Sequence, residues 1–96
     1  ELFHLNKIVT FYAFDNELKL NVKKLSGILQ YKEVELEKIK EYSGKSYENI
    51  FKLIKEYEAK GLVTINDNIM EYTIDGIFWG NSITASLVTQ IIDDNK

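Results

Sequence analysis

The side chains that could carry out chemistry are few. The 96-residue chain has one histidine, His4, and no cysteine. Nucleophilic triads and thiolate metal sites need these residue types, so neither is expected. His4 could ligate a haem iron, but a single histidine near a chain end, among apolar neighbours and with no evident partner to orient it, is more typical of a structural residue.

Three carboxylates offer a second candidate site. Glu33, Glu37 and Glu41 recur at intervals of four, which would place them on one face of a helix. Catalytic acid pairs need a pocket that shifts their pKa values, and nothing in the neighbouring sequence indicates a pocket. A solvated helix face explains them better. We therefore predict no catalytic residue and no metal ligand in this chain.

A DNA-reading surface is the third candidate, because the middle of the chain has a helix-turn-helix pattern. Its recognition helix would begin near Ser46, and the candidate DNA contacts would be Lys45, Ser46, Tyr47, Asn49 and Lys52. All 12 basic residues are lysine, the net charge is −3, and the predicted wing tip at residues 66–68 carries no cation. Phosphate contacts need cations or aimed donors, so the sequence argues against a nucleic-acid partner.

The composition indicates one ordinary globular domain spanning residues 1–96. Apolar residues make up 45% and charged residues 28% of the chain, and no apolar run approaches the ~20 residues of a membrane span. We expect no membrane partner and a cytoplasmic location. The chain starts at Glu1 and its only methionine is Met70. We therefore expect it to be the C-terminal piece of a longer protein.

Hydrophobic spacing predicts the elements that would position these residues. We expect helices over residues 2–14, over 22–29 with Asn21 as N-cap, over 34–42, and over 46–60 with Ser46 as N-cap and Gly61 as the stop. Two short strands around the turn at residues 66–68 and a final helix from Gly76 follow. Thr73 can N-cap this final helix, and Gly76 allows its first turn to approach a neighbouring segment closely. The predicted fold is mainly α with a small β-hairpin, a winged-helix-like domain with an extra helix at each end.

The aromatic pair Phe78-Trp79 allows two interpretations. Aromatic residues at helical spacing usually pack inward, and both rings would then help to seal the core of this domain. Alternatively, at least one of the two rings is exposed and contacts another domain or a flat macrocycle. Asn81, a polar residue on a mostly apolar helix, could bond to the backbone of the hairpin.

Four short motifs in the second half of the chain follow one another in a recognisable order. They are Tyr42-Ser43-Gly44, Gly61-Leu62, Thr73-Ile74-Asp75-Gly76 and Asn81-Ser82-Ile83. Together they resemble the C-terminal domain of the oxygen-independent coproporphyrinogen III oxidase family of radical S-adenosylmethionine proteins, which includes haem-chaperone-like and anaerobic haem-degrading relatives. The Phe78-Trp79 pair departs from the family pattern and is closer to the haem-degrading branch.

The resemblance implies a non-catalytic accessory domain. In the family, an N-terminal barrel carries a three-cysteine motif that binds the iron–sulfur cluster used to cleave S-adenosylmethionine, and this chain has no cysteine. The implied partner is that barrel, and the implied contacts with it or with a tetrapyrrole are Phe78, Trp79 and Asn81. Two alternatives stay open: a small winged-helix regulator that binds DNA or protein, and a structural dimerisation module.

Overall fold

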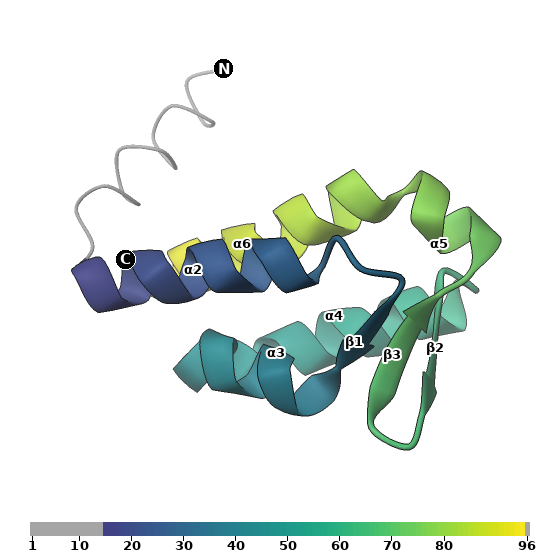
Figure 1. The fold of residues 1–96 in the computed structure, drawn as a ribbon, viewed down its shortest axis with the longest axis horizontal. Coiled ribbons are helices and arrows are strands. Elements are labelled where there is room, and N and C mark those ends of the chain that lie inside the picture. The colour runs from purple at the N-terminus through teal and green to yellow at the C-terminus, as the bar shows by residue number, and fades with distance from the viewer. Residues whose placement is uncertain (1–14, 96) are drawn as a thin grey trace.

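The computed structural model describes residues 15–95 (Figure 1). Helices α2 (Asn16–Ile28), α3 (Leu36–Ser43), α4 (Tyr47–Ala59), α5 (Ile74–Phe78) and α6 (Gly80–Asp94) accompany a 3₁₀ turn η1 (Gly44–Ser46) and strands β1 (Glu33–Glu35), β2 (Val63–Asn66) and β3 (Ile69–Tyr72). The fold is mainly helical with a small antiparallel sheet, as predicted. The helix expected over residues 2–14, including His4, lies outside the described residues.

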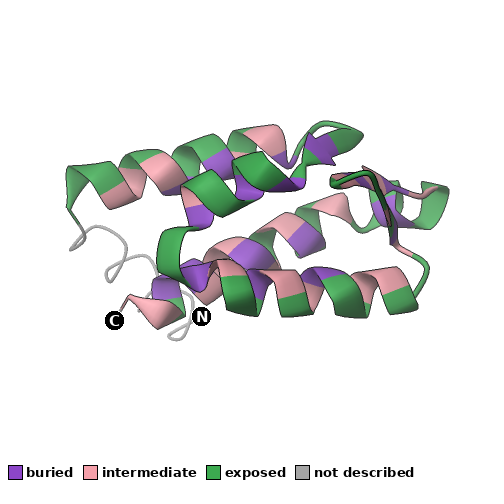
Figure 2. Cartoon of the chain, turned by 90° about the horizontal axis from the view of Figure 1, so that it is seen from below, coloured by how far each residue is buried: buried purple, intermediate pink, exposed green. Residues whose placement is uncertain are grey.

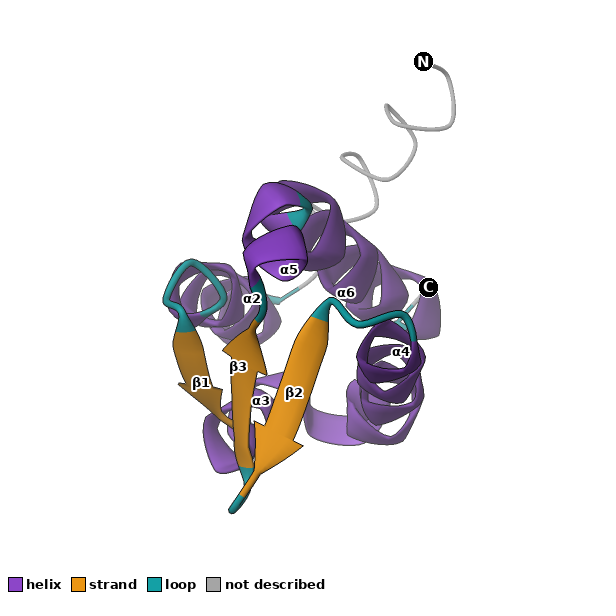
Figure 3. Ribbon diagram, turned by 90° about the vertical axis from the view of Figure 1, so that its right-hand side faces the viewer, coloured by secondary structure: helices purple, strands orange, loops and turns teal. Residues whose placement is uncertain are grey.

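The sheet has the strand order β1-β3-β2, and both pairings are antiparallel (Figure 3). Asp67 and Asn68 both have positive φ, 52° and 63°, so a two-residue turn joins β2 to β3. The predicted hairpin is therefore confirmed. Strand β1 was not predicted, because residues from Val34 onward were assigned to a helix. Val34 instead pairs with Met70, and both side chains are buried.

Helix α4 stops where the sequence predicted. Gly61 takes a φ of 78°, which favours glycine, and its N–H bonds the Glu58 carbonyl while the Leu62 N–H bonds the Tyr57 carbonyl. The start of α4 differs from the prediction. Ser46 precedes the helix with a helical backbone, because η1 leads directly into α4, and its buried side chain makes no capping hydrogen bond.

Helix α2 begins earlier than the sequence suggested. The Asp15 carboxylate accepts a hydrogen bond of 2.8 Å from the Leu18 N–H, which makes Asp15 the N-cap. The prediction that Asn21 caps this helix is wrong, since Asn21 lies within α2. Asp15 follows directly after the helix expected over residues 2–14, where a capping residue is easily mistaken for the end of the preceding segment.

The core lies where the helices meet the inner face of the sheet (Figure 2). Every element except α5 contributes at least one side chain that is nearly inaccessible to solvent, such as Leu25 of α2, Ile39 of α3, Ile54 of α4, Met70 of β3 and Leu87 of α6. Helices α2 and α6 contact each other, and α4 contacts α6 and β2. The sheet and α5 lie together at one end of the molecule (Figures 1 and 3).

The final helix of the prediction is two helices. The helix is interrupted at Trp79, which separates the short α5 from the 15-residue α6. The C-terminal part packs as expected, with Ile83, Leu87 and Ile91 buried. The N-terminal part does not, because its large side chains are exposed to solvent.

Candidate docking site

Four large apolar side chains project into solvent within six residues of each other. The exposed fractions are 85% for Ile74, 57% for Ile77, 88% for Phe78 and 58% for Trp79. We call these four residues the α5 patch. Contiguous exposed apolar surface on a small domain typically marks a contact with another molecule. The interpretation that Phe78 and Trp79 seal the core is therefore wrong for this chain.

The reason for the exposure lies in how α5 is attached to the rest of the fold. Gly76 is the buried residue of α5, and a Cβ on it would lie 1.7 Å from the Leu62 carbonyl oxygen. The side of α5 that faces the protein is thus backbone and glycine, as the sequence suggested for Gly76. The bulky side chains of the same turn must point elsewhere.

Thr73 fixes the position of this turn. Its Oγ1 accepts a hydrogen bond of 3.0 Å from the Gly76 N–H, which caps α5 as predicted, and lies 2.7 Å from the Gly61 carbonyl oxygen. The Thr73 N–H also donates to the Leu62 carbonyl at 3.0 Å. These bonds tie α5 to the end of α4, so the α5 patch is held on a defined support.

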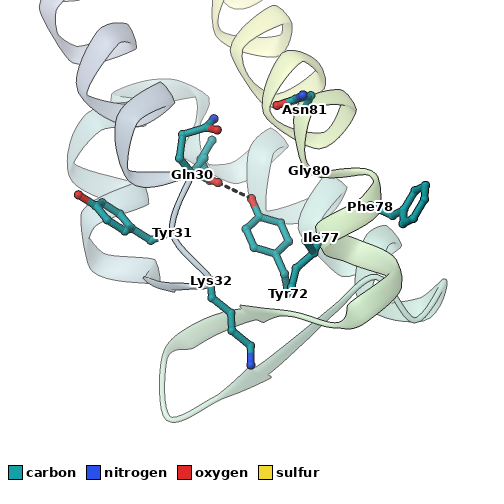
Figure 4. A pocket seen from close by; sticks show the side chains of 9 residues that line it. Gln30, Tyr31, Lys32, Tyr72, Ile77, Phe78, Gly80 and Asn81 are labelled. Carbon is teal, nitrogen blue, oxygen red and sulfur yellow. Dashed lines mark hydrogen bonds between the residues drawn. The ribbon is translucent and has the colours of Figure 1, made fainter.

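A groove of about 250 Å³ opens beside the α5 patch (Figure 4). One wall is the chain leaving α2, with Gln30, Tyr31 and Lys32, and the other is the α5–α6 segment with Ile77, Phe78 and Asn81. The walls come from segments more than forty residues apart in the sequence. No local pattern could therefore have revealed this groove.

Tyr72 forms part of the groove between these walls. Its hydroxyl donates to the Leu29 carbonyl at 3.0 Å, and the ring is almost fully buried (Figure 4). Burial raises the pKa of the Tyr72 hydroxyl more than the Thr84 hydroxyl lowers it. The phenol therefore stays neutral, and its hydrogen bond links β3 to the end of α2.

Asn81 lies on the wall of the groove at the start of α6. The expected hydrogen bond to the hairpin backbone is absent, and its amide contacts no hydrogen-bonding partner within residues 15–95. The amide is exposed to solvent. Phe78, Trp79 and Asn81 are therefore close together and accessible, the arrangement that the contact interpretation requires.

The five candidate DNA contacts are, as a group, less accessible to solvent than Phe78, Trp79 and Asn81. Ser46 is fully buried, Tyr47 is half-buried, and Lys52 lies 4.0 Å from the carboxylate of Glu48. Burial raises the pKa of Tyr47, and the negative charge of Glu37 raises it further. Lys45 is exposed to solvent.

Asn49 is held by a carboxylate from the far end of the chain. Its amide lies 3.3 Å from Asp94, which also accepts a 2.9 Å hydrogen bond from Gln90. Burial acts to raise the pKa of Asp94. Hydrogen bonds from the side chains of Asn49, Ser46 and Gln90 nevertheless hold that pKa below its ordinary value, and the positive charge of Lys45 acts in the same direction. A negative charge therefore sits where a DNA phosphate would approach α4.

The carboxylate cluster of the prediction is not one helix face. Glu33 belongs to β1, whereas Glu37 and Glu41 belong to α3. All three are exposed, so their assignment as solvated residues is confirmed. Within residues 15–95 no group of three or more acidic, histidine or cysteine side chains is placed to hold a metal ion. None of the helices in that range is both long and apolar enough to cross a bilayer.

Comparison with known proteins gives no relative. No family model, no curated protein and no solved structure matches this chain. The resemblance of its four motifs to the coproporphyrinogen III oxidase family stays a prediction from the sequence.

Proposed function

We propose that this chain is a non-catalytic winged-helix domain that docks on another polypeptide through the α5 patch. The element order helix, strand, helix, helix, strand, strand supports a winged helix, with α4 in the position of the recognition helix and the β2–β3 hairpin as the wing. One observation carries the docking function: four large apolar side chains are exposed on a rigidly attached turn.

The identity of the partner rests on the motif resemblance. We propose the catalytic barrel of a radical S-adenosylmethionine enzyme of tetrapyrrole metabolism, part of the same protein, in the cytoplasm. The iron–sulfur cluster and S-adenosylmethionine would belong to the barrel. Two residues of the Thr-x-x-Gly motif, Thr73 and Gly76, support the resemblance at the level of the fold, because both position α5.

A tetrapyrrole would meet this domain only at its surface. The groove of about 250 Å³ is below the range of about 300–1,000 Å³ typical of pockets that enclose ligands. Phe78 and Trp79 could stack on one face of a macrocycle held by the barrel. The domain would then act as a cover over the barrel's ligand.

DNA binding is the alternative that the winged-helix order favours. Against it, Ser46 is buried, Asn49 is occupied by Asp94, and the turn at the wing tip contains Asp67. The net charge of −3 supplies no general attraction for phosphate. Docking on protein agrees better with these charges.

The test begins with the reading frame that encodes the chain. The proposal expects a C-x-x-x-C-x-x-C motif upstream of Glu1 in the same frame. It also expects that backbone amides of α5 exchange more slowly with deuterium in the longer product than in the isolated chain. An initiator codon directly before Glu1, together with salt-sensitive binding to duplex DNA, would contradict it and favour the regulator.

A further inference from the structure

We infer that the α5 patch and the groove beside it take a basic polypeptide segment, one in which a bulky apolar side chain is flanked by lysine or arginine. This inference rests on the proposed docking function and adds the chemistry of the partner. It follows from the charges around the patch, which are arranged on the outer face of the sheet and on α5 itself.

The sheet register gathers carboxylates on one face. Val34 and Met70 are paired and buried, so their strand neighbours Glu33, Glu35 and Glu71 project outward. Glu33 lies directly opposite Glu71. Like charges in this cross-strand position destabilise a sheet, so a positive group from outside would be favoured here.

The positive charges available nearby do not neutralise this face. The Nζ of Lys32 lies 3.5 Å from Glu71 and pairs with that carboxylate. Lys60 lies beside Gly61, whose carbonyl contacts Thr73, and it forms no ion pair with another described residue. Neither Glu33 nor Glu35 forms an ion pair with another described residue.

The acidic face adjoins the apolar one. Lys32 both lines the groove and pairs with Glu71, so the groove ends at the row of glutamates. Asp75 adds a further exposed carboxylate within α5, between Ile74 and Gly76. Figure 3 shows α5 directly above the sheet at the same end of the molecule. A segment lying across the α5 patch would thus place its flanking residues beside the carboxylates.

The groove suits one anchoring side chain. Its volume of about 250 Å³ can hold a side chain such as leucine or phenylalanine between Tyr31 and Ile77, over the ring of Tyr72. The exposed amide of Asn81 and the side chain of Gln30 on the walls can bond the backbone of such a segment. Phe78 points away from Tyr72 and would pack on the next apolar residue of the partner (Figure 4).

Two other classes of ligand fit these charges less well. Anionic membranes would be attracted by lysine around an exposed apolar turn, but here the turn is bordered by glutamate and aspartate. The carboxylates of a free tetrapyrrole would meet the same repulsion, with Lys32 already paired. A basic polypeptide uses both the apolar and the acidic surface.

The test uses the full 96-residue chain and a random peptide library displayed on phage. Selected peptides are synthesised, and their affinities are measured by fluorescence anisotropy for the wild-type chain and two variants, Phe78→Asp and Glu33→Lys/Glu35→Lys. Leu20→Asp, which changes an exposed leucine on α2, is the control for the first. Glu37→Lys/Glu41→Lys, with the same charge change on α3, is the control for the second. Circular dichroism checks that each variant folds.

We expect the selected peptides to combine an aromatic or leucine anchor with lysine or arginine. Phe78→Asp should weaken their binding about tenfold or more, as for a central contact residue. Glu33→Lys/Glu35→Lys should weaken it about fivefold at low salt, and added salt should shrink this difference. The two controls should bind within about twofold of wild type.

The other outcomes separate the inference from the proposed function. Peptides that need Phe78 but carry no basic residues, and that ignore the charge reversal, overturn the basic partner and leave the docking function standing. A library that yields no Phe78-dependent peptide overturns both. Phe78-dependent cosedimentation with phosphatidylcholine–phosphatidylserine vesicles, without such peptides, would replace the polypeptide by a membrane.

Discussion

Helices α4 and α5 carry similar apolar residues and use them in opposite ways. In α4 the residues Ile50 and Ile54 recur at helical spacing, and both are completely buried. In α5 the residues Ile74, Ile77 and Phe78 lie close together in the sequence, and all three are exposed. Helix α4 has 13 residues and α5 has five.

The difference shows that attachment, as well as hydrophobicity, decides which side chains are buried. Helix α4 is long enough for one stripe to face the core throughout. Helix α5 is attached through the backbone near Gly76, which contacts the Leu62 carbonyl, and through the Thr73 hydroxyl. A turn that is attached through glycine leaves its large side chains to the solvent, and their exposure then needs a partner to explain it.

The largest expected effect is on the free energy of unfolding when one large side chain is truncated in α4 and, separately, in α5. Ile54→Ala should lower the free energy of unfolding by about 2–5 kcal/mol, because it leaves a cavity in the core. Phe78→Ala should change it by no more than about 0.5 kcal/mol, since that ring is exposed. Urea unfolding followed by circular dichroism measures both. A Phe78→Ala penalty as large as that of Ile54→Ala would mean that α5 is part of the core.

The next prediction tests the attachment of α5. Gly76→Ala should destabilise the fold by about 1–3 kcal/mol, because the added methyl group would collide with the Leu62 carbonyl and force α5 away from α4. Gly27→Ala is the matched control: its methyl group would enter open space within α2. That substitution should stabilise the fold by about 0.5–1 kcal/mol. Equal melting temperatures for the two variants would contradict the account of the attachment.

Much of the fold could be predicted from the sequence where its signals are local. The end of α4 at Gly61, the turn at Asp67-Asn68 and the cap at Thr73 each depend on a few neighbouring residues, and each is confirmed. Strand β1 was missed because its three residues alternate too briefly to outweigh a helical pattern, and because its partner β3 is more than thirty residues away.

The candidate site was only partly predictable for the same reason. Phe78, Trp79 and Asn81 could be singled out as unusual residues. Their exposure depends on the contact between Gly76 and Leu62, and the groove depends on Tyr31 lying opposite Ile77. Periodicity carries no information about a five-residue helix, because it completes little more than one turn.

The smallest expected effect concerns the end of the molecule away from α5. The folded pKa of Asp94 lies below its ordinary value, so its carboxylate stabilises the fold fully above the unfolded pKa of about 3.9, and this stabilisation is lost as the pH falls below that value. Since the group is partly exposed, Asp94→Asn should cost about 0.5 kcal/mol or less near neutral pH.

Chemical denaturation of wild type and Asp94→Asn near neutral pH and at about pH 3 measures this difference. The two proteins should differ near neutral pH and converge in acid. A difference that grows in acid would mean that the bonds from Asn49 and Gln90 do not favour the ionised carboxylate.

The most direct test of the account is acrylamide quenching of Trp79, the only tryptophan, in the isolated chain and with a Phe78-dependent peptide bound. We predict the red-shifted emission of a hydrated indole and efficient quenching in the free chain, since Trp79 is more than half exposed. We predict that the bound peptide protects Trp79 from acrylamide. Blue-shifted emission that resists acrylamide in the free chain would place Trp79 in a core and contradict the central claim that the α5 patch is a docking surface.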